Sequence, residues 1–136
     1  MTAFLDTNIL LYSISGDPAE NKKRDIAIEL LDRDDIGLSI QVFQEFYVQA
    51  TRQSRTKPLT HAMAAGFISK WCRFAVQPMT LDILNAALGI KQRHRLSYWD
   101  SAIVAAALAL GCRELYTEDM QHGLTVDGLR LDNPFL

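Results

Sequence analysis

Four acidic side chains have the type and the position to bind a divalent metal ion: Asp6, Glu45, Asp100 and Asp119. Asp6 directly follows an apolar run that ends at Leu5, and Asp119 follows a second apolar run. An oxygen-only ligand set of this kind suits Mg²⁺ or Mn²⁺, with water and a substrate phosphate at the remaining positions. The sequence therefore indicates a site for a divalent metal ion.

Each acid also has an ordinary structural explanation. Asp6 is in a position to cap the helix that follows it, and Ser97 and Asp100 have a spacing compatible with a capping box. Glu45 is explained equally well as a solvated helix residue, and Asp119 as a turn residue after a strand. Together, however, four carboxylates at one edge of one sheet would repel one another strongly without a cation. We therefore interpret the four as one predicted metal site.

The elements that must position these acids follow an α/β pattern, because short apolar runs alternate with longer helical ones. Repeated strand–helix units predict a mostly parallel central sheet of four to five short strands, flanked by helices on both faces. Ligands of such sheets bind beyond the carboxyl ends of the strands, which is where Asp6 and Asp119 are expected. The expected strands are residues 2–5, 36–39, 74–76, 114–117 and 129–131.

Helical patterns occupy the segments between these strands, and they place the two remaining acids. Glu45 is expected on the flank of an apolar stripe, from which it can reach toward the strand ends. Asp100 is expected in the first turn of the most apolar helix, where a carboxylate must be hydrogen-bonded, paired or bound to a cation. The first two expected helices span residues 9–12 and 25–31. A third is capped by Ser39 and ends at Lys57-Pro58, and a fourth runs from Thr60 to Trp71. The last two are capped by Thr80 and by Ser97.

Composition predicts one cytoplasmic domain over residues 1–136. The chain is 49% hydrophobic and 22% charged, an ordinary balance for a globular core, and its formal net charge of −2 provides no global attraction to nucleic acid. Cys72 and Cys112 have no metal-binding spacing and are expected to be buried thiols in a reducing compartment. The N-terminus has no secretory pattern, and the apolar run at residues 103–110 is too short to span a membrane.

Two local basic clusters are the candidates for contacts to the phosphates of a nucleic acid. The alternative is that they are cations at helix C-termini that interact with the helix dipole. The clusters contain Arg52, Arg55 and Lys57 in one segment, and Arg93 and Arg95 in another.

Several segments, in this order, resemble PIN-domain nucleases, and in particular the toxin subunits of VapBC-type toxin–antitoxin pairs. The resemblance begins with FLDTNIL at residues 4–10 and continues with VFQEFY at 42–47, YWDSAI at 98–103 and YTEDMQ at 116–121. The ending DNPF at residues 132–135 also resembles this toxin group. The resemblance extends over the whole chain, including its length.

This resemblance implies a PIN-like fold and a metal-dependent endoribonuclease that leaves a 3′-hydroxyl and a 5′-phosphate. It also implies an RNA substrate, a cognate antitoxin partner and a homodimer. Glu118 is expected to face away from the metal, so Asp119 is the preferred fourth acid. The residues implied for catalysis and metal binding are Asp6, Glu45, Asp100 and Asp119, and those implied to support them by hydrogen bonds are Thr7, Asn8 and Thr117.

Two other functions remain open from the sequence. One is a housekeeping PIN-domain nuclease that processes RNA without an antitoxin. The other is a non-enzymatic, Mg²⁺-binding regulatory module such as a receiver domain, which also gathers acids at strand ends. Such modules need an Asp–Asp pair near the first strand, whereas Asp6 is followed by Thr7 and Asn8.

Overall fold

A six-stranded sheet forms the centre of the computed structural model, which describes residues 2–136. All neighbouring strands are parallel except β5, which pairs antiparallel with β6. The strand order is β3-β2-β1-β4-β6-β5, so the first strand lies in the middle and its residues are all buried. The strands are β1 (Ala3–Leu5), β2 (Ile36–Ser39), β3 (Ala75–Gln77), β4 (Glu114–Tyr116), β5 (Thr125–Val126) and β6 (Leu129–Asp132).

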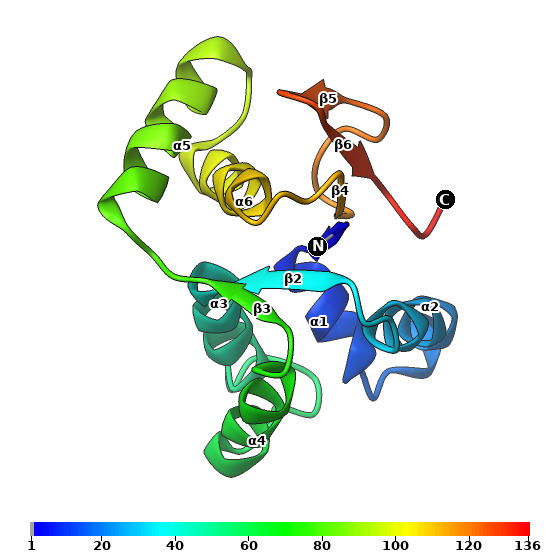
Figure 1. Ribbon diagram of the computed structural model, residues 1–136. Helices are drawn as coiled ribbons and strands as arrows, with labels where there is room; N and C mark the ends of the chain where they lie inside the picture. The colour runs from blue at the N-terminus through cyan, green and yellow to red at the C-terminus, as the bar shows by residue number, and fades with distance from the viewer. Residues whose placement is uncertain (1) are drawn as a thin grey trace.

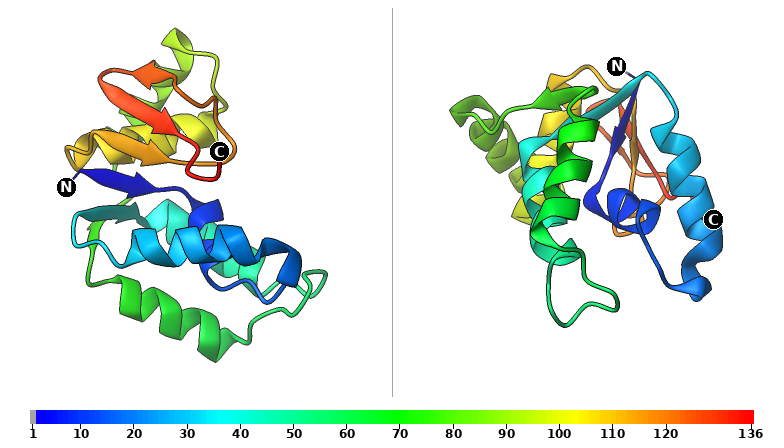
Figure 2. Two further views of the ribbon diagram at one scale, coloured as in Figure 1. Left: turned by 90° about the vertical axis from the view of Figure 1, so that its right-hand side faces the viewer. Right: turned by 90° about the horizontal axis from the view of Figure 1, so that it is seen from below.

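Helices cover both faces of this sheet, as the sequence predicts. Figure 1 shows α5 and α6 on one side and α2 on the other. In Figure 2, β1, β4 and β6 point toward the same edge, which is where α1 begins. The helices are α1 (Thr7–Ser13), α2 (Asn21–Leu31), α3 (Ile40–Ala50), α4 (His61–Trp71), α5 (Leu81–Arg93) and α6 (Tyr98–Ala109), with a 3₁₀ turn, η1 (Pro18–Glu20), before α2.

The core explains why α6 is apolar on nearly all sides. Seven consecutive residues of this helix, Ser101 to Ala107, are buried, and four of them are alanines. Small side chains allow α6 to lie close to the sheet, where it contacts β2, β3, β4 and β6. The predicted burial of this helix is confirmed. In residues 2–136, no helix has both the length and the apolar character needed to cross a membrane.

The three predicted helix caps, Ser39, Thr80 and Ser97, are confirmed, and Thr60, predicted as a helix start, is a fourth cap. The hydroxyls of Ser39, Thr60, Thr80 and Ser97 each accept a hydrogen bond from the backbone N–H three residues further on. These bonds satisfy donors that a helix leaves free at its N-terminus. Ser39 and Ser97 matter most for function, because the helices they start contain two of the four acids.

The helix that begins after Ser39 was predicted to extend to Lys57-Pro58, and this was wrong. It ends at Ala50, with Thr51 as its C-cap residue, whose hydroxyl donates to the Tyr47 carbonyl oxygen over 2.7 Å. The Leu59 N–H then reaches back to the Ala50 carbonyl oxygen over 2.8 Å, closing a loop over the intervening residues. Arg52 and the rest of the first basic cluster therefore lie in this loop and not on the helix.

Two strand predictions also need correction. The third strand is Ala75–Gln77, one residue later than the predicted range of 74–76. The short strand β5 was not predicted; it forms a hairpin with β6 through Asp127 and Gly128, whose φ angles are 49° and 89°. An Asp-Gly pair favours this two-residue turn, so the signal for the sixth strand was present in the sequence.

The prediction of two buried thiols was half wrong. Cys112 is buried, but Cys72 is exposed. Cys72 is the C-cap residue of α4 and follows the buried Trp71. One step along a helix turns the side chain by about 100°, which rotates Cys72 away from the core.

Candidate active site

Asp6 is the buried centre of the candidate site. It follows β1 and starts α1, and its side chain accepts two hydrogen bonds of 2.7 Å, one at Oδ1 from the Thr7 N–H and one at Oδ2 from the Thr117 hydroxyl. Burial raises the pKa of Asp6 to about 7, although these two bonds lower it. The charges of Glu45 and Asp100 raise the pKa further. The helix cap and the acidic site thus use the same carboxylate.

Glu45 reaches the same edge from α3. The Thr7 hydroxyl donates to Glu45 Oε1 over 2.6 Å, which connects this acid to the residue next to Asp6. Gln41, one turn earlier on α3, lies 3.5 Å from Glu45 Oε2 through its Nε2. The same Nε2 donates to the Trp99 carbonyl oxygen over 3.2 Å, so Gln41 connects α3 to the start of α6.

Asp100 is half-buried in the first turn of α6, where its N–H donates to the Ser97 hydroxyl over 3.0 Å. Burial raises the pKa of Asp100, and the charges of Asp119 and Glu45 raise it further. The capping interpretation of Ser97 therefore holds, and it does not exclude a second role. The Asp100 carboxylate therefore interacts electrostatically with two other acids of the predicted site, Asp119 and Glu45.

Asp119 is exposed and lies in the loop after β4. Asn8 Nδ2 donates to its Oδ2 over 2.9 Å, and its own N–H donates to the Thr117 hydroxyl over 3.2 Å. The neighbouring Glu118 points elsewhere, because it accepts a bond from the Tyr12 hydroxyl and forms an ion pair with Lys23. This is the orientation expected for Glu118.

The four acids interact electrostatically without a compensating cation from the chain. Within residues 2–136, none of them takes part in a salt bridge. They do not close around a single point, however: in the described part of the chain, no three acidic, histidine or cysteine side chains converge enough to hold one ion. The carboxylate donors fit Mg²⁺ or Mn²⁺ in type, and their joint coordination stays a prediction.

Comparison with known proteins identifies the family. The model of the PIN domain matches residues 3–123. The chain belongs to the PIN-domain family. A search of curated protein sequences gave no match.

Solved structures share the PIN-domain fold of this chain. A chain of a toxin–antitoxin complex from Klebsiella pneumoniae is similar over 98% of both chains, with a TM-score of 0.72 and 21% identity. VapC20 from Mycobacterium tuberculosis, described as a sarcin-ricin loop cleaving toxin, has a TM-score of 0.67 and 22% identity, covering 87% of this chain and 90% of that one. FitAcB from Neisseria gonorrhoeae has a TM-score of 0.71 and 17% identity over 98% and 99% of the two chains.

Two hollows of the PIN domain have members of the four acids in their lining, a third is lined by Asn8, and basic residues line each of the three. Arg93 and Arg95 line a hollow of about 430 Å³ together with Asp100 and Asp119. Arg93 also forms an ion pair with Asp127 over 2.7 Å, so its charge is shared.

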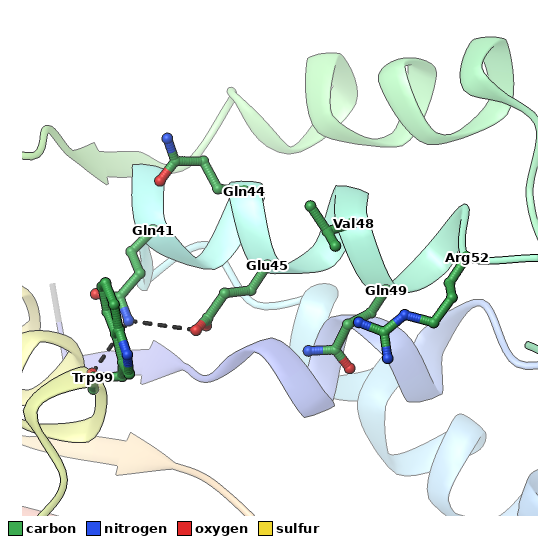
Figure 3. A pocket seen from close by; sticks show the side chains of 7 residues that line it. All are labelled: Gln41, Gln44, Glu45, Val48, Gln49, Arg52 and Trp99. Atoms are coloured by element: carbon green, nitrogen blue, oxygen red, sulfur yellow. Dashed lines mark hydrogen bonds between the residues drawn. The ribbon is translucent and has the colours of Figure 1, made fainter. Parts of the chain in front are cut away.

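The other two hollows contain residues of the first basic cluster. Arg52 lines a hollow of about 350 Å³ beside Glu45, and Arg55 lines one of about 170 Å³ beside Asn8 (Figure 3 shows the first). Lys57, by contrast, donates to the Gly16 carbonyl oxygen over 3.3 Å and lines none of these three hollows.

Sequence reasoning missed two residues of this site, Gln41 and Trp99. Gln41 lies four positions before Glu45, a spacing that places two helical side chains side by side, so this signal was available. The exposure of Trp99, at 60%, had no such signal, because large aromatic residues next to an apolar helix are normally buried.

Proposed function

We propose that this PIN domain is a metal-dependent endoribonuclease and the toxin of a type II toxin–antitoxin pair. The observation that carries the proposal is Asp6, a buried carboxylate that is 6% exposed and coupled by charge to Glu45 and Asp100. Burying an acid among other acids is costly unless a proton or a cation compensates it. A bound divalent cation would offset the negative charge of these acids and would also serve in the hydrolysis of RNA.

The residues that would hold Mg²⁺ or Mn²⁺ are Asp6, Asp100 and Asp119, together with Glu45. When bound, the ion lowers the pKa of a water molecule and offsets charge on the cleaved phosphate. Hydrogen bonds from neighbouring side chains orient three of these acids. Thr117 donates to Asp6, Thr7 to Glu45 and Asn8 to Asp119, so each of these three acids keeps one oxygen in a set direction.

The substrate and partners are proposed from the family and the similar structures. A protein of the same fold is described as cleaving the sarcin-ricin loop, which supports cleavage of RNA. Others of this fold were solved as toxin–antitoxin complexes, which supports an antitoxin that covers the acidic edge. We further expect cytoplasmic action and a homodimer. An apolar surface on α5, formed by the exposed side chains of Leu81, Leu84 and Leu88, is one that a second copy of the chain would cover. Light scattering measures the molecular mass of the purified chain and so distinguishes a dimer from a monomer.

Cleavage of RNA by matched variants tests the proposal. We expect the wild-type protein to cleave RNA with Mg²⁺ and to leave 5′-phosphates, and Asp6→Asn to lose detectable cleavage. Asn retains the shape of the side chain but not its charge, so the fold should survive. Asp82→Asn makes the same change at an exposed position in the first turn of α5 and should cleave like the wild type. Equal cleavage by Asp6→Asn would contradict the proposal.

A housekeeping nuclease without an antitoxin is distinguished from the toxin by the neighbouring gene. A small upstream gene for a DNA-binding protein that co-purifies with this chain and stops RNA cleavage supports the toxin. Membership of the PIN-domain family argues against the regulatory module.

A further inference from the structure

The hollow between α3 and the start of α6 adjoins the predicted metal site and has no part in the hydrolysis described above. Its volume of about 350 Å³ lies within the range of about 300–1,000 Å³ that is usual for small-molecule sites. Glu45 lies in its lining, and Trp99 forms one end of it (Figure 3). Of the four acids, Glu45 lines this hollow, and Trp99 directly precedes Asp100 in the chain.

Trp99 is held in place although 60% of it is exposed. Its ring meets the ring of Tyr98 edge to face, with centroids 5.1 Å apart and an angle of 77° between the planes. Its carbonyl oxygen accepts the bond from Gln41 that connects the two helices. An indole that is open to solvent offers a flat surface on which any nucleobase can stack.

The side of the hollow along α3 carries three amides and an acid around the exposed Val48, and it ends in a cation. Gln41, Gln44 and Gln49 contribute amides, which both donate and accept hydrogen bonds as the edges of nucleobases do. Figure 3 shows Arg52 at the end away from Trp99, where its guanidinium can bind a phosphate. An aromatic surface, amides and a basic group are the components of sites for single-stranded nucleic acid.

We propose that this hollow is a nucleobase subsite for single-stranded RNA. The base next to the cleaved phosphate stacks on Trp99, its edge contacts the glutamine amides, and Arg52 binds a neighbouring phosphate. This inference rests on the proposed ribonuclease function and specifies its substrate. The RNA must be unpaired at the cleavage site, because a base within a duplex cannot reach Trp99 without leaving its stack.

Tryptophan fluorescence tests the subsite without any need for cleavage. Trp71 is 4% exposed and Trp99 is 60% exposed, so an added ligand reaches only Trp99. The probe is a mixed-sequence oligoribonucleotide in EDTA, either single-stranded or annealed to its complement. We expect saturable quenching by the single strand and much weaker quenching by the duplex. Trp99→Phe, which retains Trp71, should show no saturable change.

Cleavage kinetics provide the second measurement. Stacking on one aromatic side chain contributes enough that Trp99→Ala should lower kcat/KM by roughly 5- to 150-fold. Trp99→Phe retains a ring and should restore most of that loss. Met63→Ala truncates another large side chain, 52% exposed on α4, and should cleave like the wild type.

Two results would overturn the subsite. One is the absence of RNA selectivity at Trp99, seen as equal quenching by single strand and duplex together with wild-type kcat/KM in Trp99→Ala. The other is Trp99 emission that changes with protein concentration and not with RNA, which would show that a second copy of the chain covers the hollow. Strand-selective quenching with no cleavage by the wild type would support the subsite and overturn the proposed function, so the two failures are distinguishable.

Discussion

Thr117 is buried directly after β4, and its hydroxyl donates to Asp6 Oδ2 over 2.7 Å. Thr117→Val retains the shape of this side chain and removes the bond that favours the ionised form of Asp6. Loss of such a supporting bond typically lowers metal affinity or activity by roughly 10- to 100-fold, and we expect that loss in Mg²⁺-dependent cleavage. The matched control is Thr51→Val, which removes a hydroxyl bond to a carbonyl at the end of α3. Equal activity of the two variants would contradict the supporting role.

Asp6 also predicts how the stability of the metal-free protein depends on pH. Its pKa is about 7 in the folded chain, mainly because of burial, against an ordinary 3.8. Between these values the folded state binds a proton that the unfolded chain has lost. The free energy of unfolding should therefore fall as pH rises through this window, by up to about 4 kcal/mol. Denaturation in EDTA at several pH values measures this, and Asp6→Asn should flatten the profile. An unchanged profile in that variant would oppose the prediction.

At the scale of residues, the sequence predicts some parts of the site for physical reasons and leaves others open. Asp6 is predictable because it follows an apolar run, and strand ends are set by where such runs stop. Glu45 depended on the family resemblance, because a helical Glu is usually solvated. The exposure of Trp99 was not predictable, since it depends on which distant segments lie beside the start of α6 in the folded chain.

Ser97 starts α6 and thereby sets the position of Asp100, to whose N–H it is bonded over 3.0 Å. Ser97→Ala should lower the free energy of unfolding by about 1 kcal/mol, the usual cost of losing a helix cap. Thr80→Ala removes the equivalent cap from α5 and should cost a similar amount. Because only Ser97 adjoins an acid of the site, only Ser97→Ala should also reduce RNA cleavage. If both variants cleave like the wild type at a temperature where both are folded, this positioning role is wrong.

At the scale of elements, the starts of helices were easier to predict than their ends. A Ser or Thr cap acts through a bond to its own next turn, so local sequence determines it. The end of α3 depends on a backbone bond between Ala50 and Leu59 across a loop, which no periodicity in the sequence reveals. The same reasoning applies to β5, whose two residues form a strand only because β6 is beside them.

Across the whole molecule, basic residues line the three hollows described above, and we expect bound RNA to follow a path along them. Arg52 and Arg55 are in two of them, and neither forms a salt bridge within residues 2–136. The double variant Arg52→Ala with Arg55→Ala should weaken RNA binding. A plot of the logarithm of the RNA-binding constant against the logarithm of the salt concentration should also become less steep. We expect the slope to fall in magnitude by roughly 1 for each phosphate that the variant no longer neutralises.

The control for this double variant removes the same charge from another surface. Lys22→Ala with Arg24→Ala alters two exposed residues of α2. It should leave the salt dependence close to that of the wild type. If the two double variants weaken RNA binding equally, attraction comes from overall charge and not from the proposed path.

Adding metal back to stripped protein tests whether the four acids form a metal-dependent catalytic site. Protein freed of metal with EDTA and then dialysed should not cleave RNA. Added Mg²⁺ or Mn²⁺ should restore cleavage in a saturable manner and produce 5′-phosphate ends. If the stripped protein cleaves RNA as fast as it does with added metal, the four acids do not form a metal-dependent catalytic site.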